Sequence, residues 1–73
     1  MKLICLGGPM SGIPGTPSKE GVLVLIVQHD DAPQREIFYD RRRIGRNDRE
    51  FLVERSLGDA AALEIARSLG LAD

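Results

Sequence analysis

The segment GVLVLIVQ, residues 21–28, contains the longest apolar run of the chain and decides the fold class. Its six consecutive aliphatic residues, mostly β-branched, have the length and composition of a strand. A continuous apolar run without alternation is typical of a strand that is buried on both faces. We therefore expect residues 21–28 to form the central strand of a sheet.

Strand-forming segments flank this run on both sides. Leu3–Leu6 predicts a short strand, and residues 35–40 predict another whose mixed polarity suits an edge or half-exposed position. Turn residues at 29–34 make the central run and residues 35–40 a hairpin. A polar, arginine-rich turn at 41–49 then leads into a further β-prone segment at 50–54.

The apolar period changes near the end of the chain and indicates an amphipathic helix. The repeat consists of Leu57, Ala61, Ile65 and Leu69, with Ala62 and Ala66 beside it. Ser56 suits the N-cap with Asp59 in the capping-box position, and Gly70 suits a Schellman-type end. These elements predict an α+β fold, with a small, mostly antiparallel sheet of three to four strands and one C-terminal helix packed on it. Residues 1–73 then form a single domain.

The composition excludes several classes of protein. Apolar residues make up 42% of the 73 and charged residues 29%, which suits a folded domain rather than a disordered segment. The single Cys5 supports neither a disulfide nor a cysteine-based metal site and fits a reducing cytoplasm. His29, beside two aspartates, is interpreted as a polar residue at a strand end rather than a metal ligand. We expect a cytoplasmic monomer without cofactor or metal, and no segment suits a secretion signal or a membrane span.

Residues 7–20 are rich in glycine and proline and predict a long flexible loop. Glycines that follow a strand raise the question of phosphate binding. A dinucleotide site needs G-x-G-x-x-G at the start of a helix, and no helix pattern follows here. A P-loop needs Gly-Lys-Ser/Thr, whereas Ser18 precedes Lys19. The segment is therefore a surface loop or a loop that binds a partner.

Five arginines fall within nine residues of the predicted basic turn, namely Arg41, Arg42, Arg43, Arg46 and Arg49. Guanidinium groups pair in bidentate fashion with carboxylates and phosphates, so the cluster suits an acidic partner. Because the net charge is −1, the cluster is a local patch, and an acidic protein surface fits at least as well as nucleic acid. Direct nucleic-acid contact stays open. A solvated turn also stays open, with the arginines paired to the chain's own Asp40, Asp48, Glu50 and Glu54.

No arrangement of side chains suits catalysis. Ser11, Thr16 and Ser18 lie in the predicted loop without a neighbouring base, and Asp30 and Asp31 sit at a turn. We therefore expect a protein that is not an enzyme.

The opening KLICLGGPMSG, residues 2–12, is similar to the start of nucleoside deoxyribosyltransferase-like proteins, where Ala-Gly-Pro-Met-Ser/Thr-Gly follows a strand. Residues 8–12 match this pattern, while Gly7 stands in place of the usual alanine. In that family a helix follows the loop, and further βα units carry the catalytic carboxylate; the pattern of this chain lacks both. A truncated relative of that family is the weaker alternative.

The course of the whole chain resembles the small transcription regulators that bacteriophages encode to bind host RNA polymerase. The resemblance runs through MKLICLGGPMSG, VLVLIVQHDD, FYDRRRIGRNDREF and ALEIARSLGLAD. It implies a non-enzymatic protein that binds the large polymerase subunits in the host bacterial cytoplasm, displaces the sigma factor and promotes antitermination. As contacts we expect the five arginines together with an exposed strand edge near Tyr39, where a peptide strand can pair.

Overall fold

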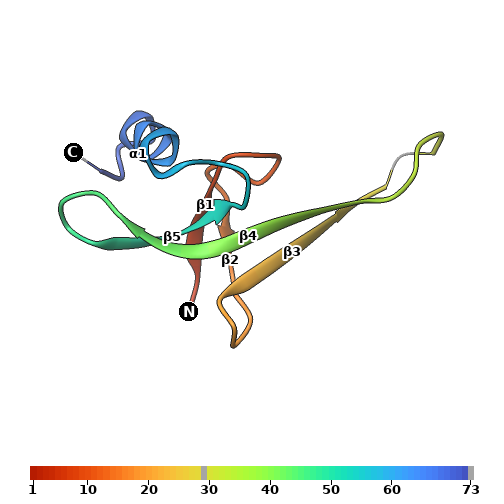
Figure 1. Ribbon diagram of the computed structural model, residues 1–73, viewed down its shortest axis with the longest axis horizontal. Coiled ribbons are helices and arrows are strands. Elements are labelled where there is room, and N and C mark those ends of the chain that lie inside the picture. The colour runs from red at the N-terminus through yellow and green to blue at the C-terminus, as the bar shows by residue number, and fades with distance from the viewer. Residues whose placement is uncertain (29, 73) are drawn as a thin grey trace.

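The computed structural model describes residues 1–28 and 30–72 and confirms the α+β class (Figure 1). The described residues form β1 (Leu3–Leu6), β2 (Pro14–Gly15), β3 (Val22–Val27), β4 (Arg35–Ile44), β5 (Arg49–Glu54) and α1 (Asp59–Ser68). One curled sheet contains all five strands in the order β2-β1-β5-β4-β3, whereas three to four strands were predicted. The additional strand is β2, a pair of residues inside the segment for which the sequence predicts only loop. His29 lies outside the described residues.

The sheet is mixed but mostly antiparallel. β1 and β5 run parallel, with Cys5 opposite Leu52 and Leu6 opposite Val53. The pairs β1–β2, β3–β4 and β4–β5 are antiparallel. A parallel pair needs a long connection between its strands, and β2, β3 and β4 all belong to the connection here.

β5 is the strand that is buried on both faces. Phe51, Leu52 and Val53 are all fully buried, although successive side chains of a strand point to opposite faces. On the face that contacts α1, Leu6, Ile44, Phe51 and Val53 pack with Ala62 and Ala66 of the helix. On the other face Leu52 packs with Cys5 and Tyr39. The core therefore lies on both sides of β5, and the helix covers only one of them.

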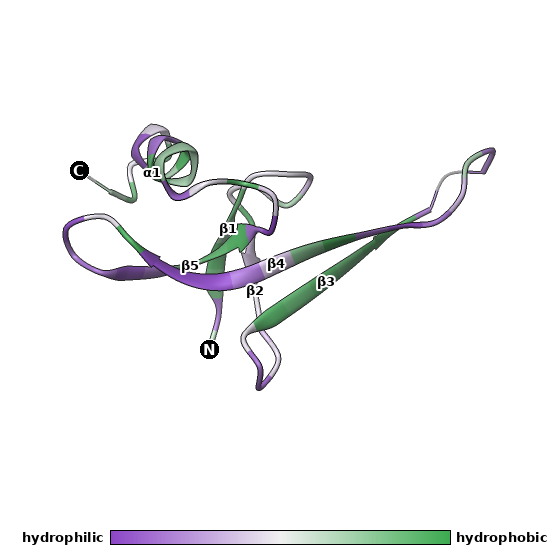
Figure 2. Ribbon diagram, viewed as in Figure 1, coloured by the Kyte–Doolittle hydropathy of each residue, from purple (hydrophilic) through white to green (hydrophobic). Residues whose placement is uncertain are grey.

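β3 is an outer strand, so the prediction that residues 21–28 form the centre of the sheet is wrong. Only β4 pairs with it among the described strands, and Val24 and Ile26 are 43% and 57% exposed. Figure 1 shows the far part of β3 and β4 projecting from the body as a two-stranded ribbon, and Figure 2 shows the hydrophobic colour of β3. We call this ribbon, residues 24–28 and 30–38, the arm. An apolar run specifies a strand but not how many neighbours the strand has.

The sheet curls so that β2 meets the start of β3. A Cβ atom placed on Gly15 would come within 2.7 Å of Leu23 Cδ2, so glycine permits this close approach. Cys5 Sγ and Leu52 Cδ1 would lie 3.4 and 3.5 Å from the same atom. The cluster around Tyr39 therefore lies inside the curl.

The predicted C-terminal end of the helix is confirmed, whereas the predicted N-cap is wrong. Gly70 has a φ of 73°, and the Leu71 N–H donates to the Ala66 carbonyl at 2.8 Å, which is the bond of a Schellman motif. At the start, Gly58 is the N-cap and contributes no side-chain bond, while the Ser56 hydroxyl bonds to the Glu54 carboxylate instead. The buried stripe is also rotated, because Ala62 and Ala66 are buried whereas Ala61 and Leu69 are exposed.

Candidate interaction surface

Much of the arginine cluster lies on β4 and not in a turn, because the strand continues to Ile44. The turn is confined to residues 45–48 and is shorter than the predicted 41–49. Alternation along the strand places Arg41 and Arg43 on one face of the sheet and Arg42 on the opposite face. The five arginines therefore do not form one continuous surface.

Arg41 and Arg43 share one carboxylate across the β4–β5 hairpin. Glu50 lies opposite Arg43 in the register, and its carboxylate oxygens lie 3.0 Å from Arg41 Nε and 3.6 Å from Arg43 Nη2. The arginine side chains are 47% and 67% exposed, so each pair contributes only about 0–1 kcal/mol. The expected pairing with the chain's own carboxylates is confirmed for these two, but one carboxylate cannot neutralise both.

Arg42 has contacts that favour a structural role. Its Nη1 donates to the Leu57 carbonyl at 2.5 Å and lies 3.3 Å from an Asp59 carboxylate oxygen. Its Nη2 donates to the Arg55 carbonyl at 3.1 Å, and only 26% of the side chain is exposed. Arg42 therefore fastens the link between β5 and α1 to the side of β4.

The end of the β4–β5 hairpin carries the other two arginines. Arg46 lies exposed in the turn. Arg49 begins β5, where its Nη1 donates to the Leu71 carbonyl at 3.1 Å and its guanidinium lies 5.5 Å from the Phe51 ring centroid. We call the set Arg41, Arg43, Arg46 and Arg49 the basic hairpin end. Its nearby carboxylates are Asp48 and Glu50, so positive charge predominates.

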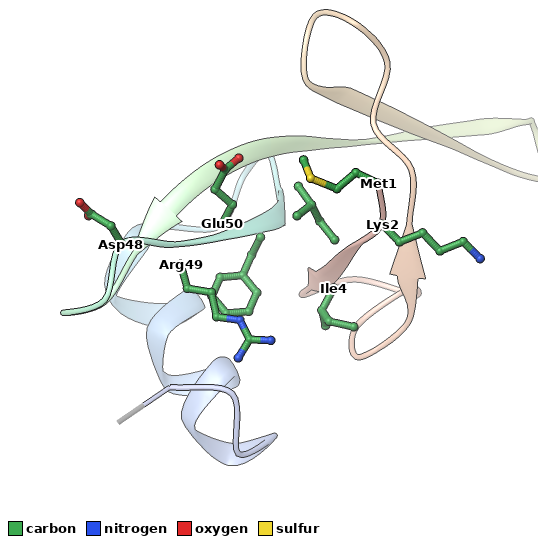
Figure 3. Close-up of a pocket in the computed structure, with 8 residues that line it drawn as sticks. Met1, Lys2, Ile4, Asp48, Arg49 and Glu50 are labelled. Atoms are coloured by element: carbon green, nitrogen blue, oxygen red, sulfur yellow. The ribbon is translucent and has the colours of Figure 1, made fainter.

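A pocket of about 350 Å³ adjoins the basic hairpin end, between the starts of β1 and β5 (Figure 3). These strands pair only from Cys5 and Leu52 onward, so the residues before them separate and leave the space open. Its lining includes apolar Ile4 and Phe51 and the charged Lys2, Asp48, Arg49 and Glu50. Figure 3 shows Lys2 and Ile4 on the β1 side and the charged hairpin residues on the β5 side. This combination suits an apolar side chain that is flanked by charged groups.

Tyr39 is not on an exposed edge, so that expectation is wrong. β4 is an interior strand of the sheet, and Tyr39 is fully buried. Its hydroxyl donates to the Gly7 carbonyl at 2.8 Å and accepts from the Met10 N–H at 3.1 Å. Burial raises the pKa of Tyr39, so the hydroxyl keeps its proton at neutral pH. The side chain fastens the glycine-rich segment to the sheet.

The first half of the glycine-rich segment forms a turn between β1 and β2. The Gly12 N–H donates to the Cys5 carbonyl at 2.8 Å, and the Cys5 N–H donates to the Ile13 carbonyl at 3.0 Å. The Gly7 N–H donates to Ser11 Oγ at 3.1 Å, and Gly7 and Gly12 both have a φ of 84°. These glycines allow a tight turn from strand to strand. The next element is β2, which agrees with the exclusion of a dinucleotide site and a P-loop.

A further cationic contact, at the base of the arm, was not evident in the sequence. Arg55 forms two hydrogen bonds of 3.1 Å to Asp40, and its guanidinium lies 4.4 Å from the Phe38 ring centroid. The bond from Arg55 holds the pKa of Asp40 below its ordinary value. Arg55 is 15 residues from Asp40, and the two meet only because β4 and β5 are paired. Sequence spacing alone carries no signal for such a pair.

Within residues 1–28 and 30–72, no group of three or more His, Cys, Asp and Glu side chains is arranged to hold a metal ion. In that part of the chain, no helix has the length and apolar character needed to cross a membrane. Comparison with known protein families, with characterised proteins and with solved structures finds no match for the chain. Function must therefore be inferred from the surface and from the sequence resemblance.

Proposed function

We propose that this chain is a non-enzymatic regulator that binds the large subunits of bacterial RNA polymerase through the basic hairpin end. Binding displaces the sigma factor and inhibits transcription initiation in the bacterial cytoplasm, and binding to the elongating enzyme promotes antitermination. The identity of the partner rests on the resemblance to phage-encoded regulators. The choice of surface rests on the charge and shape of the basic hairpin end.

The observation that carries the proposal is a cationic surface beside an open pocket. Arg43 is 67% exposed and Arg46 lies in an exposed turn, so both can meet carboxylates of a partner. A side chain of the same partner can enter the pocket above Phe51. Charge-assisted hydrogen bonds are stronger when an interface excludes water than when they are solvated, as the pairs of the free chain are. Carboxylates of a partner can therefore compete with Glu50 for these arginines.

A titration against purified core polymerase tests the proposal. The variant Arg43→Glu with Arg46→Glu reverses the two exposed charges. The matched control is Lys19→Glu with Arg35→Glu, which makes the same charge change at exposed positions outside the basic hairpin end. We expect the first variant to bind at least about tenfold more weakly and the control to bind as the wild type does. Release of a labelled sigma factor should follow the same order.

The possible failures are distinguishable. If both double variants bind polymerase as tightly as the wild type does, the basic hairpin end is excluded as the contact surface, while polymerase remains the partner. No binding by the wild type would exclude polymerase itself.

A nucleic-acid-binding module is the second candidate, because the same exposed Arg43 and Arg46 can contact phosphates. Titration with DNA and RNA over a salt series separates the two functions. Binding through phosphates weakens steeply as salt rises, since counterions are released. Tight, salt-sensitive binding of either nucleic acid without polymerase would favour this second candidate.

A deoxyribosyltransferase-like activity is the weaker candidate, and one observation favours it. A second pocket of about 350 Å³ lies beside the residues that carry that resemblance, and Gly8, Pro9 and Glu54 line it. The Glu54 carboxylate accepts a hydrogen bond from the Ser56 hydroxyl. Release of free base from a deoxynucleoside, abolished in Glu54→Gln, would establish the activity, and no release would exclude it.

A further inference from the structure

At the basic hairpin end, one carboxylate lies between two arginines. Glu50 Oε2 is 3.0 Å from Arg41 Nε, and Glu50 Oε1 is 3.6 Å from Arg43 Nη2. Glu50 belongs to β5 and lies opposite Arg43 of β4, so its side chain bridges two residues of the neighbouring strand. Each carboxylate oxygen therefore meets a different guanidinium group, and the surface already accommodates a carboxylate at this place.

The fold depends little on this bridge. Among residues 1–28 and 30–72, the Glu50 carboxylate forms no further ion pair or hydrogen bond. The side chains of Arg41 and Arg43 are 47% and 67% exposed, so water weakens both pairs. Each pair is then worth at most about a fivefold change in an equilibrium constant. A second molecule can therefore take the place of Glu50 at little cost to the fold.

Other ion pairs of β4 differ in this respect. Asp40 accepts two hydrogen bonds of 3.1 Å from Arg55, which follows the end of β5. Arg42 pairs with Asp59 and also donates to two backbone carbonyls in the link between β5 and α1. These contacts connect elements of the fold, so a partner would have to disturb the fold to use their charges. The bridge made by Glu50 connects only neighbouring strands that the sheet already pairs.

We propose that Glu50 is an internal ligand of the basic hairpin end, and that a carboxylate of the partner replaces it between Arg41 and Arg43. In the free chain, Glu50 lowers the affinity of this surface for acidic molecules, because its release must accompany binding. Its side chain also lines the pocket beside the arginines, so the released carboxylate stays close to the incoming one and repels it.

This self-inhibition defines the class of partner. A single carboxylate gains little by replacing Glu50, because it exchanges one solvated pair for another. A protein segment with several carboxylates gains more, since one replaces Glu50 while another pairs with the exposed Arg46. The inference rests on the proposed function for the choice of surface, and it names the partner's binding element as an acidic protein segment.

The charge of the whole chain favours such a segment over nucleic acid. The net charge is −1 although the basic hairpin end is positive, so the rest of the chain is acidic. A nucleic acid is charged along its whole length and would be repelled wherever it extends beyond the basic hairpin end. A short acidic protein segment meets the basic hairpin end alone.

Titration of the chain with a hexaglutamate peptide at low salt, followed by nuclear magnetic resonance, tests the inference without polymerase. We expect Glu50→Gln to bind the peptide about three- to tenfold more tightly than the wild type does. The matched control Glu36→Gln removes the same charge from an exposed position in the arm and should gain less than about twofold. Glu50→Asp keeps the charge but shortens the side chain, so that it no longer bridges both arginines, and should gain an intermediate amount.

The Arg41 Nε–H signal reports the replacement directly. Before the titration it should differ between the wild type and Glu50→Gln. At saturation it should reach the same position in both, because the same peptide carboxylate then lies beside Arg41. A wild-type signal that keeps its initial position at saturation would mean that Glu50 stays in place, and it would overturn the proposal.

The affinities give four further ways to overturn it. These are no binding of hexaglutamate by the wild type or Glu50→Gln at millimolar concentration, equal affinity of these two chains, an equal gain in Glu36→Gln, and no gain in Glu50→Asp. A larger gain for a six-nucleotide oligothymidylate than for hexaglutamate would also contradict a carboxylate as the replacing group. Core polymerase is titrated with the same variants. If polymerase fails to bind while hexaglutamate follows the expected order, the proposed function is refuted and the role of Glu50 stands.

Discussion

Replacing Tyr39 with phenylalanine removes one oxygen atom from the interior and leaves the ring in place. Among the described residues, this oxygen forms the only hydrogen bonds between a β4 side chain and the turn that follows β1. Without it, the Gly7 carbonyl loses its donor and the Met10 N–H loses its acceptor. We expect the variant to fold with a weakened attachment of residues 7–12.

The expected loss follows from the burial of the two groups. The Tyr39–Gly7 bond of 2.8 Å is buried, and an unsatisfied buried carbonyl costs about 1–3 kcal/mol. The bond to Met10, at 3.1 Å, is partly buried, so water can replace some of it. Together they give a loss of roughly 2 kcal/mol in the free energy of unfolding. A chain of 73 residues has about 4–11 kcal/mol in total, so the loss is a large fraction of its stability.

Urea unfolding followed by far-ultraviolet circular dichroism measures this loss. With a slope of about 1 kcal/mol/M, the midpoint should fall by roughly 2 M. Tyrosine fluorescence is unsuitable because Tyr39 is the single tyrosine of the chain. Amide exchange gives a second readout, in which Met10 and Gly12 should lose more protection than residues of β5.

Ser68→Ala is the matched control, because it removes a hydroxyl whose bond to the Ile65 carbonyl, at 2.8 Å, is exposed. We expect it to change stability by less than about 0.5 kcal/mol. A loss in Tyr39→Phe as small as that of the control would refute the reasoning. It would mean that the buried bonds contribute no more than solvated ones and that packing alone holds the turn.

Three further predictions concern the same framework. Gly8→Ala should destabilise by more than about 1 kcal/mol, since φ is +63° and the added Cβ would lie 2.5 Å from Tyr39 Oη. Gly58→Ala, with nothing within 4 Å, should stay within about 0.5 kcal/mol by urea unfolding. Arg42→Ala should lose about 1–3 kcal/mol because the Leu57 and Arg55 carbonyls lose their donor, whereas Arg46→Ala should leave the urea midpoint unchanged. Burial raises the pKa values of Cys5 and Tyr39 above 9.0 and 10.0, so the folded state holds these protons more tightly than the unfolded state. The stability that these two protonated groups contribute to the folded state is complete at neutral pH and is lost as the pH rises through and above this range. The urea midpoint should therefore fall between pH 7 and 11, and it should fall less steeply in Tyr39→Phe than in the wild type.

The sequence predicted where the strands and the helix lie along the chain better than it predicted which strands are neighbours in the sheet. The continuous apolar run located the strand at residues 22–27, the apolar period located the helix, and Gly70 located the Schellman end, because these features depend on local conformation. Local conformation does not specify which strands pair. The most apolar run became the outer β3, while the shorter run in β5 became the strand buried on both faces.

The candidate site was predictable in residue type but not in arrangement. The arginine cluster is evident in the sequence, yet its division between two faces follows from β4 continuing to Ile44. Arg42 finds its acceptors in the link to α1, and Tyr39 finds the Gly7 carbonyl 32 residues away. Such contacts depend on tertiary folding, and no spacing rule along one strand indicates them.

β4 connects the arm to the turn of the β4–β5 hairpin. The strand has ten residues, from Arg35 in the arm to Ile44 beside the turn, and is about 30 Å long. Ile26 lies opposite Glu36, near the arm end of β4, whereas Arg43 and Arg46 lie at and beyond its other end. A partner that binds through Arg43 and Arg46 therefore leaves Ile26 outside the contact. Ile26→Lys should leave binding to that partner in dilute solution unchanged. A loss of binding would place Ile26 within the contact itself and contradict the separation of the two regions.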